Sequence, residues 1–115
     1  GFRQQSDIQK AQIQLSISEE NLDSAKREIS ASVASAVRKH SMLLEMLALQ
    51  KDSIFKASEA VRVAKEQYHN GEGTLLDVLD VKGNLISTKF QRIEIQFEAI
   101  IAKAELEALS GIEEE

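Results

Sequence analysis

The chain has 115 residues, of which 43% are hydrophobic and 29% charged, a balance that is ordinary for a foldable chain and predicts a single domain. Aromatic residues make up only 4%, and tryptophan, proline and cysteine are absent. A disulfide framework and thiolate chemistry are therefore excluded, and an aliphatic, alanine-rich helical core is favoured over a β-sandwich. The net charge of −5 argues against a nucleic-acid partner, and no apolar run approaches the ~20 residues of a membrane-spanning helix.

The first predicted element is a single long helix over residues 4–70, because no glycine or proline interrupts residues 2–70. Ser6 and Gln9 have the spacing of a capping box at its start. Apolar residues recur every seven positions, at Ile8, Leu15, Leu22, Ile29, Ala36 and Leu43. Small residues stand three positions later, at Ala11, Ser18, Ala25 and Ser32. The pattern predicts a coiled-coil seam that a partner helix approaches closely, on a helix roughly 100 Å long.

The phase of this seam changes in the middle of the helix. After Leu43 the apolar row jumps four residues to Leu47 and then resumes at Ile54, Val61 and Tyr68. A jump of four residues is a stutter, which unwinds the supercoil locally without ending the helix. A kink near residues 37–42 that folds the chain into three helices is the alternative, although no helix-breaking residue lies there.

A short turn over residues 71–74 is predicted to connect this helix to a second one over residues 75–110, with residues 111–115 as a solvated tail. Asn70 and Gly71 are residues that end helices in the left-handed conformation, and Gly71 is needed there on backbone grounds alone. Thr74 and Asp77 are expected as the N-cap and N3 residues of the second helix. Because the turn is short, the two helices should be antiparallel neighbours.

The second helix carries two apolar rows on roughly opposite sides. One row consists of Leu76, Leu79, Gly83, Ile86, Phe90, Ile93, Phe97, Ile100 and Ala104. The other consists of Val78, Val81, Leu85, Ile95, Ala99, Ala102, Leu106 and Leu109. An acidic face that includes Asp77 and Asp80 and a basic face that includes Lys82, Lys89 and Lys103 separate them. A helix with a neighbour on each side, in a curved wall of helices, needs two such rows; a buried helix in a bundle is the alternative.

The second helix is too short to cover the first. Residues 4–38 are left without a partner in the chain, although their seam requires one. We therefore expect that the chain is a piece of a larger protein, as a start at Gly1 rather than methionine also suggests, or that it self-associates.

Three short stretches resemble a known family. Residues 60–68 lead from a helix through Tyr68 to Gly71, residues 74–80 read Thr-Leu-Leu-Asp-Val-Leu-Asp, and residues 108–111 read Ala-Leu-Ser-Gly. This resembles the TolC-like outer-membrane efflux channels, whose repeats combine a helix, a Tyr-x-x-Gly turn and a Leu-Leu-Asp-Val-Leu-Asp-Ala type of helix. The resemblance spans nearly the whole chain. It implies an all-α, coiled-coil hairpin within the periplasmic α-barrel of a homotrimeric channel.

The resemblance also implies roles for individual residues. Gly71 falls at the hairpin tip, where family members meet a periplasmic adaptor protein that links them to an inner-membrane pump. Asp77 and Asp80 fall where acidic residues line the periplasmic entrance, and Tyr68 matches a tyrosine that holds the entrance closed. Some members carry an arginine where this chain has Gly73, so a latch that relies on this cation is not expected here.

Structural explanations exist for the same residues. Asp77 can serve only as a cap residue favoured by the helix dipole, and Tyr68 can simply be a core aromatic that ends the seam. No catalytic constellation, cofactor motif or metal-binding motif is present, so the chain is not expected to be an enzyme. The leading hypothesis is a segment of an outer-membrane efflux channel that exports small molecules; the alternative is a coiled-coil scaffold or oligomerisation module without a pore.

Overall fold

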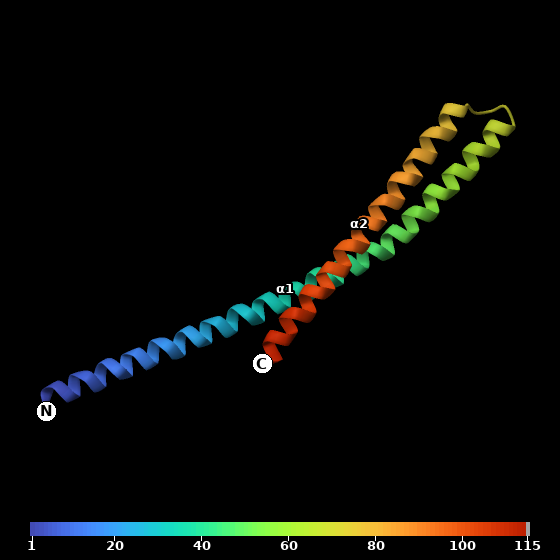
Figure 1. The fold of residues 1–115 in the computed structure, drawn as a ribbon. Helices are drawn as coiled ribbons and strands as arrows, with labels where there is room; N and C mark the ends of the chain where they lie inside the picture. The colour runs from blue at the N-terminus through green and yellow to red at the C-terminus, as the bar shows by residue number, and fades with distance from the viewer. Residues whose placement is uncertain (115) are drawn as a thin grey trace.

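The structure, a computed structural model, describes residues 1–114, with side chains described for residues 1–112. It consists of two helices, α1 (Phe2–His69) and α2 (Leu75–Glu114), which run antiparallel as one extended hairpin (Figure 1). The predicted fold class, an all-α antiparallel hairpin, is confirmed. Neither described helix contains a stretch long and apolar enough to cross a membrane.

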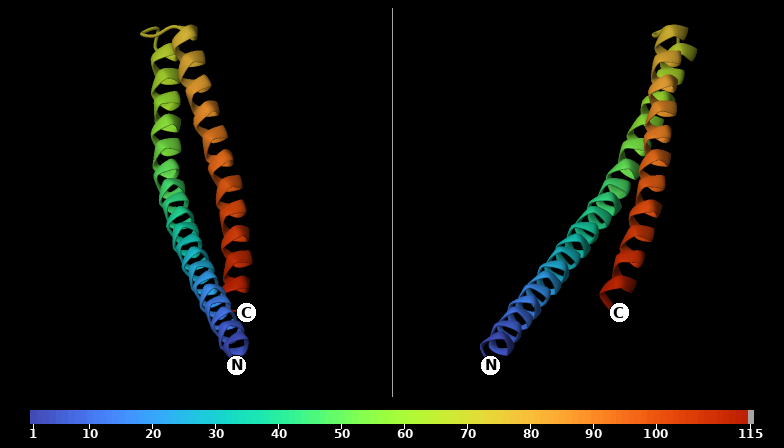
Figure 2. Two further views of the ribbon diagram at one scale, coloured as in Figure 1. Left: turned by 90° about the vertical axis from the view of Figure 1, so that its left-hand side faces the viewer. Right: turned by 60° about the vertical axis from the view of Figure 1, so that its left-hand side comes forward.

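Helix α1 is a single unbroken helix of 68 residues. The longest dimension of the molecule is 104 Å, close to the ~102 Å expected for a straight helix of that length. The helix bends only gently (Figure 2), so the alternative of a kink near residues 37–42 is wrong. Because α1 begins at Phe2, Ser6 lies inside the helix and is not its N-cap.

The two helices meet along one narrow row of residues on each. Apart from Glu59, the buried and half-buried residues of α1 between 29 and 64 are Ile29, Val33, Ala36, His40, Leu43, Leu47, Gln50, Ile54, Ala57, Val61 and Ala64. Those of α2 between 78 and 109 are Val78, Val81, Leu85, Thr88, Arg92, Ile95, Ala99, Ala102, Leu106 and Leu109. Both rows alternate steps of three and four, which is the spacing of an antiparallel coiled coil. Its tightest part packs Leu43 and Leu47 of α1 against Ile95, Ala99 and Ala102 of α2.

The predicted stutter after Leu43 is not present on the face that α2 covers. The spacing of three and four continues through Leu43 and Leu47 without a jump, because His40 and Gln50 occupy row positions where an apolar residue was expected. Polar residues at single core positions of a coiled coil lower stability but help to fix the register. The apparent change of phase therefore arises because two positions of one continuous row carry polar residues.

The second helix is longer than predicted. Residues 111–114, expected in a tail, continue α2 to Glu114. A glycine within a helix costs only about 1 kcal/mol relative to alanine, and Gly111 does not have the positive φ of a helix-ending glycine. Glu115 lies outside the described residues.

Because α2 extends further, less of α1 lacks a partner than the predicted residues 4–38. Along one heptad row, Ile8, Leu15 and Leu22 are 58–59% exposed, whereas the next member, Ile29, is half-buried. The segment without a partner is therefore residues 2–28, which we call the arm. In Figure 1 the arm projects beyond the C-terminal end of α2.

Candidate functional site

The tip of the hairpin is a compact helix-ending turn built around Gly71. Its φ of +76° lies in the left-handed region, and Gly71 is the only residue with positive φ in the described part of the chain. The backbone N–H of Gly71 donates to the carbonyl of Tyr68 (3.2 Å), and that of Glu72 donates to the carbonyl of Gln67 (2.8 Å). These two bonds define a Schellman motif, which satisfies the last carbonyls of α1. The tip therefore presents a fixed backbone shape.

The first turn of α2 is closed by a reciprocal capping box. The backbone N–H of Thr74 donates to Oδ2 of Asp77 (3.0 Å), and the backbone N–H of Asp77 donates to Oγ1 of Thr74 (3.1 Å). The predicted cap is confirmed. The bond from the backbone of Thr74, together with the threonine hydroxyl, holds the pKa of the Asp77 carboxyl below its ordinary value of 3.8.

This capping box makes the start of α2 sensitive to acid. Because the pKa of Asp77 is lower in the folded chain than in the unfolded one, its contribution to stability is present above pH 3.8 and is lost as the pH falls through the folded-state pKa. We expect the free energy of unfolding to decrease more between pH 6 and pH 3 in the natural chain than in Asp77→Asn. Urea denaturation followed by circular dichroism measures this difference. An equal decrease in the free energy of unfolding in the two chains would show that protonation of Asp77 does not weaken the capping bond.

Gly73 is the second residue of the tip at which a side chain is restricted. A Cβ atom added there would lie 3.3 Å from Cβ of Gln67 and 3.6 Å from Oδ2 of Asp77. Since Cβ of Gln67 is fixed to the α1 backbone, a larger residue requires the turn to shift by a few tenths of an ångström. The tip is thus packed for glycine at the position where some members of the family mentioned above carry arginine.

The remaining predicted site residues lie close to this turn. Tyr68 is 44% exposed, so it is not the buried core aromatic considered as an alternative. Its ring centroid lies 5.9 Å from that of His69, with the two planes tilted by 56°. Asp77 and Asp80 are both exposed, one turn apart at the start of α2. The fold therefore brings Tyr68, Gly71, Asp77 and Asp80 to one end of the hairpin.

The first apolar row of α2 is left open by the hairpin. Every one of its members is exposed: Leu76, Leu79, Gly83, Ile86, Phe90, Ile93, Phe97, Ile100 and Ala104. The second row, by contrast, is the one that packs against α1. An exposed apolar surface of this length is typical of an interaction site. We call this set of residues the outer row.

Four polar residues of the seam, His40, Gln50, Thr88 and Arg92, were not predicted to lie there, and two of them have buried polar atoms without a partner. Oε1 of Gln50 and Nε of Arg92 are buried, and neither has a hydrogen-bonding partner among the described residues. Leu43 packs against Ala99. Because the helices are antiparallel, Gln50, seven residues after Leu43, lies level with Arg92, seven residues before Ala99. In the sequence, only the regular spacing of three and four residues indicates that they belong to the seam. That spacing is unbroken only when polar residues are counted as members of the row.

A comparison with protein families agrees with this geometry. Residues 1–112 match the family model described as outer membrane efflux protein. No curated protein matches the chain, and no solved structure matches it. The chain belongs to the outer membrane efflux protein family, a family of transport proteins, and its resemblance to TolC-like channels is confirmed.

Proposed function

We propose that this hairpin forms part of the wall of an α-helical tunnel in the periplasm, within a homotrimeric efflux channel of the outer membrane that exports small molecules. The observation that carries the proposal is the outer row of α2, which is apolar along its length and exposed throughout. A helix that packs against α1 with one face and against a further helix with the opposite face belongs to a curved sheet of helices. Membership of the outer membrane efflux protein family agrees with this role.

The alternative of a coiled-coil scaffold without a pore explains less of the molecule. A scaffold hairpin needs a single apolar row on each helix. In a scaffold of this kind nothing packs against the outer row of α2. Its large side chains, such as Phe90 and Phe97, would then stay exposed to water, which is unfavourable. The tunnel wall accounts for both rows.

In this proposal the hairpin tip is the surface that docks the periplasmic adaptor and, through it, the inner-membrane pump. The tip has the fixed backbone of the Schellman motif and no large side chain at Gly71 or Gly73, so a partner can approach its backbone closely. Asp77 and Asp80 line the entrance beside it. In a trimer they form rings of carboxylates, which raise the local cation concentration.

The entrance assignment is tested most sharply at Asp80, because Asp77 also serves as a cap. In the full channel protein that contains this hairpin, Asp80→Asn is expected to reduce cation selectivity in single-channel recordings. Glu105→Gln removes a charge from the same polar face far from the tip and is the matched control. Unchanged selectivity in Asp80→Asn, or an equal change in the control, would reject the entrance role.

Tip docking is tested by adding bulk at Glu72. A tryptophan at Gly71 would strain the left-handed backbone, whereas Glu72 contributes only its backbone N–H to the turn and its side chain is exposed. We expect Glu72→Trp to abolish crosslinking of the channel to its adaptor. Gly71→Asn, which tolerates the same backbone conformation, is expected to retain it. Crosslinking that survives Glu72→Trp would contradict docking at the tip.

A further inference from the structure

The middle of the seam between α1 and α2 contains a polar layer. Gln50 of α1 and Arg92 of α2 lie level with each other, and both are half-buried. Oε1 of Gln50 and Nε of Arg92 are buried, and neither atom has a hydrogen-bonding partner in the part of the chain that the structure describes. A buried polar atom without a partner destabilises the folded state, so such atoms are rare in native proteins. The layer therefore calls for an explanation.

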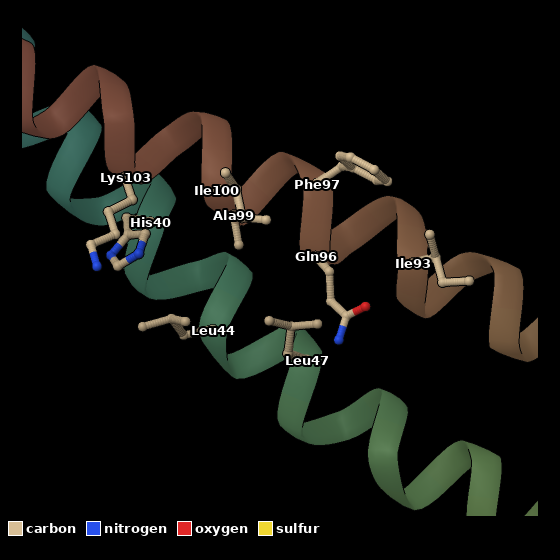
Figure 3. A pocket seen from close by; sticks show the side chains of 9 residues that line it. All are labelled: His40, Leu44, Leu47, Ile93, Gln96, Phe97, Ala99, Ile100 and Lys103. Atoms are coloured by element: carbon tan, nitrogen blue, oxygen red, sulfur yellow. The ribbon is translucent and has the colours of Figure 1, made fainter.

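The neighbouring side chains of the seam do not satisfy this layer. On the side away from the tip, Leu47 and Ala99 project between the two helices (Figure 3), and their side chains carry no polar atoms. On the side of the tip, the hydroxyl of Thr88 donates to a backbone carbonyl of its own helix (2.8 Å), so its proton is not available to the glutamine. Gln96, one turn after the arginine, is exposed, so its amide needs no partner in the seam.

The two unpaired atoms are chemically complementary. Nε of arginine carries a hydrogen that it donates, whereas Oε1 of glutamine accepts. Packed helices have axes about 8–10 Å apart, and both side chains are long, so changes in their torsion angles alone can bring the two atoms together. A hydrogen bond from a charged guanidinium is also stronger than a bond between neutral groups. Each residue thus offers the partner that the other lacks.

We propose that Nε–H of Arg92 donates to Oε1 of Gln50 and that this bond fixes the register of the two helices. Sliding one helix by a heptad keeps both rows in phase. In one direction, however, it places Arg92 level with Leu43 and Gln50 level with Leu85, and in the other it places each of them level with an alanine. Both polar groups would then be buried without a partner, so the observed register is favoured. The turn fixes the register at the tip, and this pair fixes it again in the middle of the hairpin. The bond is a property of the hairpin itself and goes beyond its proposed place in a channel wall.

A double-mutant cycle tests the bond, with urea denaturation of the 115-residue chain at a fixed concentration as the measurement. Gln50→Leu and Arg92→Leu each leave one buried polar group without its partner, whereas the double variant removes both groups. Its folding equilibrium constant should therefore exceed, by roughly tenfold, the value expected from two independent effects. Gln96→Leu makes the same chemical change one turn from Arg92 at an exposed position, so its effect should combine with that of Arg92→Leu additively, within about twofold. Additive effects at Gln50, or equal coupling at Gln96, would overturn the proposal.

Gln50→Glu tests the same geometry by strengthening the bond. A carboxylate at this position accepts a charge-assisted hydrogen bond from Arg92, so the folding equilibrium constant at neutral pH is expected to rise roughly tenfold. The gain should be lost below about pH 4, because the carboxyl group is then protonated. In the Arg92→Leu background the same change should destabilise the hairpin, since it leaves a half-buried carboxylate without a cation. A loss of stability in Gln50→Glu while Arg92 is present would contradict the pairing.

Nuclear magnetic resonance observes the bond directly. The hydrogen on Nε of Arg92 should exchange with water roughly tenfold more slowly than that of Arg27, whose side chain is 68% exposed. Gln50→Leu should remove most of this protection, because the acceptor is lost, whereas Gln96→Leu should leave it unchanged. An exchange rate of Arg92 that is the same in Gln50→Leu and in the natural chain would show that Gln50 is not its partner.

Discussion

Replacing Leu43 with alanine is expected to lower the free energy of unfolding of the hairpin by about 3 kcal/mol, within the ~2–5 kcal/mol typical of buried leucines. Leu43 is only 2% exposed and packs among Ile95, Ala99 and Ala102. The alanines that face it cannot extend into the space left by the lost side chain. The cost therefore includes an unfilled cavity as well as the lost burial of apolar surface. Urea denaturation at a fixed chain concentration measures it.

Leu49→Ala provides the matched control for this prediction. Leu49 lies in the same helix six residues later but is 69% exposed. The change in intrinsic helix propensity is the same at both positions, so it cancels in the comparison. We expect Leu49→Ala to change the free energy of unfolding by no more than ~0.5 kcal/mol. Similar losses in the free energy of unfolding at Leu43 and Leu49 would show that α2 does not pack against the face of α1 that contains Leu43.

The turn was the most predictable part of the fold, because local chemistry determines it. A left-handed backbone after a helix favours glycine, and Gly71 has that conformation. A threonine followed three residues later by aspartate can satisfy two backbone N–H groups at a helix start, and Thr74 and Asp77 do so. Neither inference needs knowledge of distant contacts. Since the turn is short, the antiparallel hairpin followed from it.

The packing of the two helices was less predictable, because tertiary contacts override local patterns. The row of α1 that faces α2 includes His40 and Gln50, which the periodicity of apolar residues could not assign to a core. The apolar residues Leu44 and Leu49 beside it are exposed. Likewise, the end of α2 could not be located from Gly111, because a glycine ends a helix only where the backbone turns left-handed.

The two apolar rows of α2 were recognisable in the sequence, but which of them faces α1 was not. The structure assigns Val78, Ile95 and Ala102 to the hairpin seam and leaves Phe90 and Phe97 exposed. The assignment has a simple cause. The seam row of α2 has the small residues Ala99 and Ala102 where it packs against Leu43, which lets α1 approach closely there, whereas the larger aromatic side chains of the outer row would hold the helices apart. The roles of Tyr68, Gly71, Asp77 and Asp80 in gating or docking remain predictions.

The assembly of the full channel protein is expected to depend on the outer row far more than the stability of the hairpin does. Phe90 and Phe97 are both 63% exposed, so Phe90→Glu with Phe97→Glu should leave the helix content and melting of the isolated hairpin nearly unchanged. In the tunnel wall each ring would be buried by a neighbouring helix and contribute about 2 kcal/mol. Losing both corresponds to ~4 kcal/mol, or roughly a thousandfold in the association constant.

We therefore expect the double variant to abolish both the assembled channel, measured by native electrophoresis of membrane extracts, and export of its substrates. Gln91→Glu with Glu98→Gln alters neighbouring residues on the polar face without touching the outer row, and should assemble and export normally. A double phenylalanine variant that still assembles and exports would show that the outer row does not contact a neighbouring helix, and the proposal of a tunnel wall would fail. Loss of assembly in the control as well would indicate a general sensitivity of this helix instead. Leu43→Ala tests the face of α2 that packs against α1 and stabilises the hairpin. The double phenylalanine variant tests the opposite face, which in this proposal joins the hairpin to its neighbours.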